Sequence, residues 1–291
     1  MIKSQMLRLG VHTSIAGGLH MSLERARDLG CNTVQIFSHN PRGWALRERE
    51  EDEISLFKSL ADRYSVEPIF IHTSYLINLA SADRSLRKKS MEMVINELRI
   101  ADSAGAQFVV LHTGSSCGDD PRTARKRASS VLREVSQRGK WRAGLLLENT
   151  AGERGDITSR IEEISDIIEN VPAGLIAGVC LDTCHAFAAG YSLTSEEGID
   201  SLAGDVRKYV GPEAVRLLHL NDSKGEISSG VDRHEHIGRG KIGLRGFTSL
   251  LKHPFYSGIP LILETPKKLK DDDVMNLRVV KRLIAALGNR V

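Results

Sequence analysis

The chain has 291 residues, of which 41% are hydrophobic and 26% are charged, and its formal net charge is +3. This composition excludes a disordered or fibrous protein, and no apolar run approaches the roughly 20 residues that a membrane-spanning helix needs. We therefore expect a globular, cytoplasmic protein, and the small positive charge weakly favours an anionic partner.

Short apolar segments alternate with longer segments of helical spacing along the chain. Eight of them have the length of strands and lie near residues 8–13, 33–37, 68–72, 107–112, 144–148, 177–182, 215–220 and 260–264. Their nearly continuous apolar character is typical of parallel strands that are buried on both faces. No Pro/Gly/Ser-rich linker divides the chain. The pattern predicts a TIM (β/α)8 barrel, an α/β fold, with one catalytic domain over residues 1–291.

Several of the intervening segments carry local helix signals. Isoleucines recur at spacings of four, three and four residues, at positions Ile157, Ile161, Ile164 and Ile168. Thr194 and Glu197 have the spacing of a capping box, which predicts the start of the next helix. Gly30 follows a segment with helical spacing and is expected to end that helix, because glycine readily adopts the left-handed conformation.

Six of the eight apolar runs carry an ionisable residue at or near their end. These residues are His72, His112, Glu148, Asp182, His219 and Glu264. An unpaired buried charge costs several kcal/mol or more, so stability alone gives no reason for this pattern. The active sites of TIM barrels lie at the C-terminal ends of the strands. We therefore expect the six side chains to meet at one end of the barrel and to bind a common ligand.

Three further residues extend this set. His185 follows Asp182 by three residues, and Asp232 and His234 lie in the polar stretch after His219. Imidazole and carboxylate groups without thiolate suit Zn²⁺, Mn²⁺ or Fe²⁺, and zinc fits five histidines best. Because zinc usually takes about four ligands, nine groups exceed one site and predict a cluster with a bridging carboxylate. Clusters of this kind serve phosphoryl transfer or hydrolysis.

The other histidines and the cysteines have simpler interpretations. We expect His12, His20, His39, His236 and His253 to be structural residues, although His236 stands close to His234. The four cysteines, Cys31, Cys117, Cys180 and Cys184, form no CxxC pair and are expected to be small buried thiols.

Five segments resemble the signature blocks of the endonuclease IV family of apurinic/apyrimidinic endonucleases. They are SYLINLAS at 74–81, LENTAG at 147–152, GVCLDTCHAFAAGYSL at 178–193, LHLNDSKGEISSGVDRHEHIGRGKIG at 218–243, and the late segment LILETP. The resemblance extends from about Leu9 to Pro266, which is most of the chain. These segments are long and combine uncommon residues, so a chance match is improbable.

The resemblance implies a TIM barrel that uses three zinc ions, with Mn²⁺ as an alternative at one site. Glu148 would be the catalytic, bridging carboxylate. It would share one ion with His72 and His112, and a second ion with Asp182, His219 and Glu264. The third ion would be held by His185, Asp232 and His234. The implied reaction is hydrolysis of the phosphodiester 5′ to an abasic site in base excision repair, which leaves a 3′-hydroxyl and a 5′-deoxyribose phosphate, with 3′ repair diesterase activity as a possible accompaniment.

The partner implied by the resemblance is double-stranded DNA that contains an abasic site. We expect a monomer that does not associate with membranes. Arg42, Tyr75 and Leu76 are candidates to fill the gap in the duplex, although Tyr75 and Leu76 directly follow a strand and could instead cap the barrel. Ser116 stands where family members often have a second histidine, so the contact of that histidine is not carried over to this chain.

Two other functions are compatible with a barrel. A metal-dependent sugar isomerase or epimerase would need fewer ligands, and His185, Asp232 and His234 argue against it. A non-catalytic DNA-binding barrel would not need an intact ligand set. Metal content separates the three, with about three zinc ions per chain for the nuclease, one or two for the isomerase and none for the binding protein.

Overall fold

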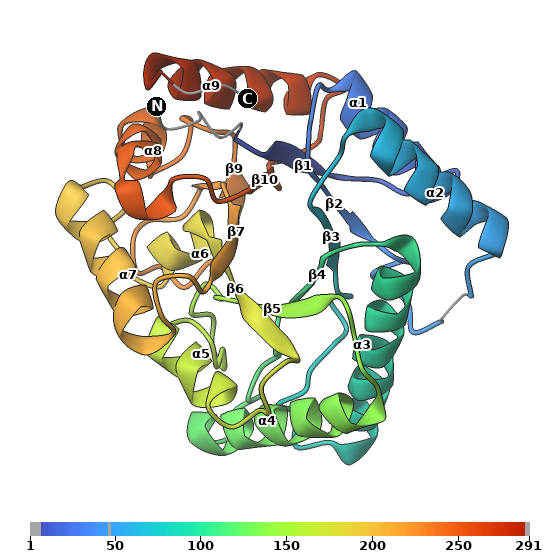
Figure 1. Ribbon diagram of the computed structural model, residues 1–291. Helices are drawn as coiled ribbons and strands as arrows, with labels where there is room; N and C mark the ends of the chain where they lie inside the picture. The colour runs from blue at the N-terminus through green and yellow to red at the C-terminus, as the bar shows by residue number, and fades with distance from the viewer. Residues whose placement is uncertain (1–6, 46–47, 289–291) are drawn as a thin grey trace.

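Eight parallel strands form a closed barrel at the centre of the molecule (Figure 1), in a computed structural model that describes residues 7–45 and 48–288. Around the barrel the strands follow the order β1, β10, β7, β6, β5, β4, β3 and β2. Their bounds are β1 Leu9–Thr13, β2 Val34–Phe37, β3 Ile69–His72, β4 Phe108–Leu111, β5 Gly144–Glu148, β6 Ile176–Asp182, β7 Val215–His219 and β10 Leu261–Leu263. Each strand coincides with one of the eight predicted apolar runs, which confirms the TIM barrel.

Helices connect successive strands and surround the barrel (Figure 1). Their bounds are α1 His20–Asp28, α2 Glu51–Tyr64, α3 Arg84–Ala104, α4 Pro121–Arg138, α5 Ile161–Ile168, α6 Thr183–Ala188, α7 Glu196–Tyr209, α8 Gly243–Lys252 and α9 Asp272–Ala286, with a short 3₁₀ helix, η1, at Pro254–Tyr256. None of the helices in the described ranges combines the length and apolar character needed to cross a membrane.

Two predicted helix starts differ from the structure. The helix α7 is capped by Ser195, whose side chain accepts a hydrogen bond from the backbone N–H of Gly198 at 3.2 Å, so the predicted Thr194–Glu197 capping box is wrong by one residue. Ile157 lies outside α5, because Glu163 accepts a hydrogen bond from the backbone N–H of Arg160 and fixes the start at the next residue.

The predicted end of α1 is confirmed, since Gly30 has a φ of +65° just beyond the helix.

Side chains alternate along each strand between two apolar cores. One core lies between the strands and the helices and includes Ile71, Leu147 and Leu181. The second is small and is formed by residues of the alternate positions, Phe70, Val110, Leu146, Cys180, Leu217 and Ile262. Because successive strand residues point to opposite faces, the second core fills the interior of the barrel. The next interior position toward the C-terminal end of each of these strands therefore lies at the barrel mouth.

The cysteines divide between these environments. Cys31, Cys180 and Cys184 are buried free thiols, as expected. Cys117 is exposed, so the expectation of burial is wrong for it. It lies in the turn after β4 with a φ of +53°, where the chain runs over the surface.

The segment after β7 departs from the regular strand and helix alternation. It forms a small antiparallel pair of strands, β8 Asp222–Ser223 and β9 His234–Glu235. The buried Asp222 carboxylate accepts hydrogen bonds from the backbone N–H groups of Gly238, Gly240 and Ile242 at 2.9 to 3.0 Å. This carboxylate therefore fixes the chain that follows β9.

Candidate metal centre

The six ionisable residues at the strand ends project into the mouth of the barrel. Each lies two residues beyond a member of the interior apolar core, in the pairs Phe70 and His72, Val110 and His112, Leu146 and Glu148, Cys180 and Asp182, Leu217 and His219, and Ile262 and Glu264. Since the side-chain period of a strand is two residues, each ionisable residue shares the interior face of its apolar partner. The strand period thus converts six separate sequence positions into one polar layer above the apolar core.

The first candidate group contains His72, His112 and Glu148. Their potential ligand atoms lie within 4.8 Å of one another. His72 Nε2 is 3.2 Å and His112 Nε2 is 3.0 Å from the same carboxylate oxygen, Glu148 Oε2. His72 and Glu148 are buried, whereas the His112 side chain is about one-third exposed at the mouth.

The second candidate group contains Glu148, Asp182, His219 and Glu264, again with all ligand atoms within 4.8 Å. His219 Nδ1 lies 3.0 Å from Glu148 Oε1 and 3.2 Å from Glu264 Oε2. Asp182 Oδ2 is 3.8 Å from the same nitrogen. Glu148 therefore offers Oε2 to the first group and Oε1 to the second, which is the geometry of a bridging carboxylate.

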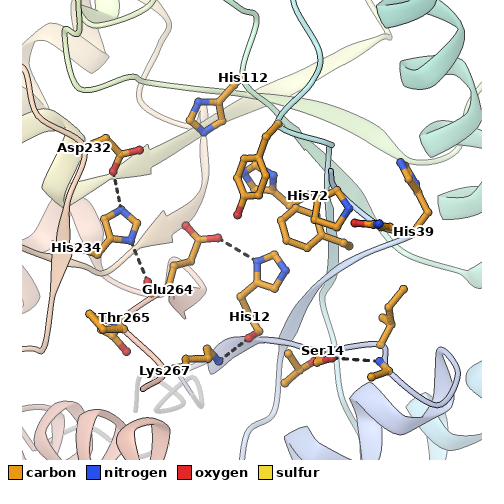
Figure 2. Close-up of a pocket in the computed structure, with 18 of the residues that line it drawn as sticks. His12, Ser14, His39, His72, His112, Asp232, His234, Glu264, Thr265 and Lys267 are labelled. Atoms are coloured by element: carbon orange, nitrogen blue, oxygen red, sulfur yellow. Dashed lines mark hydrogen bonds and ion pairs between the residues drawn. The ribbon is translucent and has the colours of Figure 1, made fainter. Parts of the chain in front are cut away.

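The third candidate group contains His185, Asp232 and His234. Asp232 Oδ1 lies 3.1 Å from His185 Nε2 and 3.3 Å from His234 Nε2. Asp182 caps α6 by accepting a hydrogen bond from the backbone N–H of His185 at 2.9 Å, so one residue connects the second and third groups. Figure 2 shows Asp232 and His234 on one side of the pocket, beside Glu264.

Three of the histidines are oriented by backbone carbonyls. In each of them Nδ1 lies at hydrogen-bonding distance from a carbonyl oxygen, which leaves Nε2 free to act as an acceptor or a ligand. The pairs are His72 with Thr73 at 2.8 Å, His185 with Asn149 at 2.9 Å, and His234 with Glu264 at 2.9 Å. The Nε2 atoms of His185 and His234 are buried, and although Asp232 Oδ1 lies 3.1 and 3.3 Å from them, neither forms a hydrogen bond of suitable geometry. Buried polar atoms of this kind fit the ligands of a cation.

The electrostatics of the centre also fit cations. Burial acts to raise the pKa of Glu148, but His112 and His219 outweigh it and leave this pKa well below the usual value. Burial acts in the same way on Glu264, and His219 again lowers its pKa well below the usual range. With Asp182 and Asp232, the centre therefore gathers four carboxyl groups. Divalent ions would balance this negative charge while the histidines remain neutral.

Two cysteines lie close enough to the centre to be considered as ligands. Cys180 is grouped with Glu148 and His219, and Cys184 with Asp182 and His234. Burial raises the pKa of each thiol to about 12. Since the thiolate is the ligand form of cysteine, these protonated thiols are poor ligands, and the imidazole and carboxylate set remains the better donor set.

A cavity of about 910 Å³ opens above the centre and is lined by His12, Phe37, Tyr75, Lys267 and several of the candidate ligands (Figure 2). Tyr75 stands at its rim with 68% of its surface exposed, and its ring centroid is 5.3 Å from that of Phe37. The cavity is therefore open to a ligand from outside, directly over the candidate metal-binding groups.

The three candidate DNA contacts lie on two neighbouring loops at this rim. Arg42 follows β2 and is exposed, whereas Tyr75 and Leu76 follow β3. Ser74 Oγ donates a hydrogen bond to the carbonyl oxygen of Pro41 at 2.7 Å and ties the two loops together. Ser116 is buried, and its backbone N–H donates a hydrogen bond to the carbonyl oxygen of Gly155 at 2.7 Å, which joins the loops after β4 and β5.

The five histidines interpreted as structural stand outside the candidate metal-binding groups. Among the described residues, none of the groups suited to a metal ion includes any of them. His236 Nδ1 lies 3.0 Å from Asn276 Nδ2, and His253 Nε2 lies 2.8 Å from Asp200 Oδ1. His12 is the one that reaches the centre, because its Nδ1 is 3.1 Å from Glu264 Oε1.

Gln35 contacts the centre directly, although the sequence did not predict it as a site residue. It is buried in β2, and its amide lies against His12, His219 and Glu264. The only sequence signal was a polar residue within the apolar run at 33–37. That signal does not indicate which distant residues the amide meets.

Sequence relatives agree with this architecture. A family model described as a xylose isomerase-like TIM barrel matches residues 23–283. A protein of Methanoculleus marisnigri named probable endonuclease 4 is 38% identical over 282 residues, which cover 97% of this chain and 100% of the relative. A protein of the same name from Halothermothrix orenii is 41% identical over 274 residues and covers 93% of this chain and 99% of the relative.

Solved structures separate the family from the wider fold. Endonuclease IV from Thermus thermophilus matches with a TM-score of 0.85 and 36% identity, over 96% of this chain and 99% of that one. A D-tagatose 3-epimerase-like protein matches with a TM-score of 0.72 but only 20% identity, over 97% of this chain and 98% of that one, and so shares the fold alone. The endonuclease proteins share 36 to 41% identity with this chain over nearly the full length of both chains. The chain belongs to the endonuclease IV family.

Proposed function

We propose that this protein is a zinc-dependent apurinic/apyrimidinic endonuclease that hydrolyses the phosphodiester 5′ to an abasic site in double-stranded DNA. The products would carry a 3′-hydroxyl and a 5′-deoxyribose phosphate. The observation that carries the proposal is the set of three contiguous candidate metal-binding groups at the barrel mouth, two of which share Glu148. Membership of the endonuclease IV family supports the same reaction.

Three zinc ions fit the nine residues in the proposed assignment. His72 and His112 would hold the first ion, Asp182, His219 and Glu264 the second, with Glu148 between them. His185, Asp232 and His234 would hold the third ion. Divalent ions in such a cluster lower the pKa of water and neutralise charge on the equatorial and leaving oxygens of a phosphodiester.

The protein side chains have the task of holding this arrangement rigid. Glu148 is fully buried at the end of β5, and each of its oxygens faces a different candidate group. The carbonyl contacts to the Nδ1 atoms of His72, His185 and His234 orient the imidazoles. A preorganised centre of this kind stabilises developing charge without reorganisation during the reaction.

Recognition of the substrate requires contacts that do not depend on a base at the lesion. A missing base lowers the energy needed to take the damaged nucleotide out of the stack. Arg42, Tyr75 and Leu76 lie on two tied loops at the rim of the cavity, and Tyr75 is well exposed. We assign these side chains to the gap in the duplex. The barrel would act as one catalytic domain and as a monomer.

The test is an incision assay on duplex DNA that contains one abasic analogue. We expect a nick on the 5′ side of the analogue, with a 3′-hydroxyl end, and complete loss of the nick after chelation. An undamaged duplex of the same sequence is the control and should stay intact. Incision that persists in the presence of chelator, or equal cutting of the undamaged duplex, would contradict the proposal.

A metal-dependent sugar epimerase on the same barrel is the second function considered. Epimerase structures share only the fold with this chain, at 20% identity or less. An epimerase would need fewer ligands than this chain brings together. The third candidate group, which contains His185, Asp232 and His234, would have no role in an epimerase.

A further inference from the structure

Gln35 occupies an unusual position for an uncharged polar side chain. It is fully buried in β2, and its amide contacts three residues that lie in or directly after other strands. Gln35 Nε2 lies 2.6 Å from Glu264 Oε1 and 3.0 Å from His12 Nδ1, whereas Gln35 Oε1 lies 2.8 Å from His219 Nε2. One amide therefore bridges two candidate ligands of the second metal-binding group.

The orientation of this amide is determined by its neighbours. A carboxylate that binds a metal ion is ionised, and in that form Glu264 accepts hydrogen bonds and cannot donate them. An atom of Gln35 only 2.6 Å from Glu264 Oε1 must therefore be the amide nitrogen. A flipped amide would place two acceptors against each other. The amide oxygen is consequently the atom that faces His219.

The amide oxygen in turn determines the proton position on His219. Because Gln35 Oε1 can only accept, His219 Nε2 must carry a proton. In the neutral imidazole this leaves the lone pair on Nδ1. Nδ1 is the atom that faces the carboxylates of Glu148 and Glu264, at 3.0 and 3.2 Å. The amide thus selects the tautomer that can hold a metal ion.

His219 differs here from three other candidate ligands. His72, His185 and His234 have their second nitrogen at a backbone carbonyl, which a substitution cannot remove. His219 has its second nitrogen at a side chain. The tautomer of His219 is therefore open to a direct mutational test.

We propose that Gln35 is a positioning residue of the second metal-binding group, which selects the Nε2-protonated tautomer of His219 and holds the carboxylate of Glu264 in place. This inference rests on the proposed function, because it requires that the group binds zinc. Partners of metal-ligating histidines typically change metal affinity by about 10- to 100-fold when they are removed.

The test compares Gln35→Met with the unmodified protein, both loaded with zinc and titrated with a chromophoric chelator. We expect one class of zinc ion to be released at a chelator concentration about 10- to 100-fold lower in the variant. Gln107→Met is the matched control, because Gln107 directly precedes β4 and lies away from the centre. Its amide accepts a hydrogen bond from the backbone N–H of Ile69 and donates one to the carbonyl oxygen of Gly105. The control should release zinc as the unmodified protein does.

A second measurement does not depend on the folding of a variant. Nitrogen-15 NMR of histidine-labelled, zinc-loaded protein should show His219 with its proton on Nε2. A proton on Nδ1, or identical zinc release from Gln35→Met and the unmodified protein, overturns the inference. Absence of zinc binding by the unmodified protein would instead overturn the proposed function, and the inference with it.

Discussion

Two buried polar clusters near the mouth of the barrel shift the pKa values of their carboxyl groups in opposite directions. One is the candidate metal centre, in which neighbouring histidines hold the pKa values of Glu148 and Glu264 well below their usual range. The other contains Glu97 of α3 with Ser38 and His39, which follow β2. Burial raises the pKa of Glu97 to about 8, although the hydrogen bond from Ser38 opposes this effect.

The difference lies in the number of carboxyl groups and in their surroundings. A single buried carboxyl group stays protonated and neutral, because burial disfavours its charged form. The four carboxyl groups of the metal centre face five imidazoles, and the buried Nε2 atoms of two of these imidazoles form no hydrogen bond of suitable geometry. Buried histidines and acids alone therefore do not indicate a metal site. Several carboxylates and imidazoles whose ligand atoms converge within 4.8 Å of one another do indicate such a site.

The largest expected effect comes from removing the bridging carboxylate. Glu148→Ala should reduce cleavage of the abasic duplex by more than about a thousandfold, because residues that act as one unit lose nearly all activity together. Binding of the abasic duplex should remain measurable by fluorescence anisotropy. Cleavage close to the unmodified rate, with zinc present, would contradict the assignment of Glu148.

Two nearby histidines, one inside the third group and one outside it, offer a matched comparison. His234→Ala should lose one zinc ion per chain and slow cleavage by at least roughly a hundredfold, since even the loss of a residue that only supports a ligand costs about 10- to 100-fold. His236→Ala should keep the zinc and the cleavage rate, because His236 pairs with Asn276 and stands outside the group. Metal analysis of both variants, together with their cleavage rates, checks this. Equal behaviour of the two variants would remove the distinction between ligand and structural histidine.

A smaller effect is expected at the rim. Tyr75→Ala should weaken binding of the abasic duplex by about 1 to 3 kcal/mol, the range found when aromatic rings that stack on bases are removed. Tyr209→Ala is the control, since that tyrosine lies at the end of α7 and contacts Lys208. Binding isotherms measured at one salt concentration compare the two. If Tyr75→Ala binds as tightly as the control, Tyr75 caps the barrel instead of contacting DNA.

The smallest effect on activity is expected at Glu97, in the cluster that it forms with Ser38 and His39. The folded protein holds a proton on Glu97 up to about pH 8, whereas the unfolded chain releases it near the usual pKa of 4.5. Between these pH values the folded state binds more protons, so this group makes stability fall as the pH rises, by at most about 1.4 kcal/mol per pH unit.

Glu97→Gln should remove this contribution and leave the cleavage rate unchanged. Urea unfolding of both proteins at pH 5, 6, 7 and 8 measures the free energy of unfolding. We expect the advantage of the glutamine variant to grow with pH across this range. Parallel pH profiles for the two proteins would show that Glu97 ionises normally and would remove the contrast between the clusters.

The sequence allowed much of the barrel and of the candidate centre to be predicted. The alternation of apolar runs predicted all eight strands, and the strand period places residues such as His72 and Glu148 on the interior face. Local spacing also marked His185, which lies three residues after Asp182 on the capped α6. These features depend on short segments of chain, which is why they could be recognised.

What could not be predicted depends on contacts between distant segments. Gln35 and His219 are 184 positions apart, and no local pattern indicates that their side chains meet. The same limit applies to Glu97, which reaches Ser38 from 59 positions away. The start of α7 was missed for a different reason. Thr194 and Ser195 are both good caps, and the backbone conformation selects Ser195.

The most direct test of the account is the number of zinc ions that one chain holds. The purified protein would be equilibrated with zinc and separated from unbound metal. Its zinc content would then be measured by inductively coupled plasma mass spectrometry. We predict about three zinc ions per chain, held by the nine residues of the candidate metal centre. A value of two or fewer, in protein that is fully folded, would contradict it.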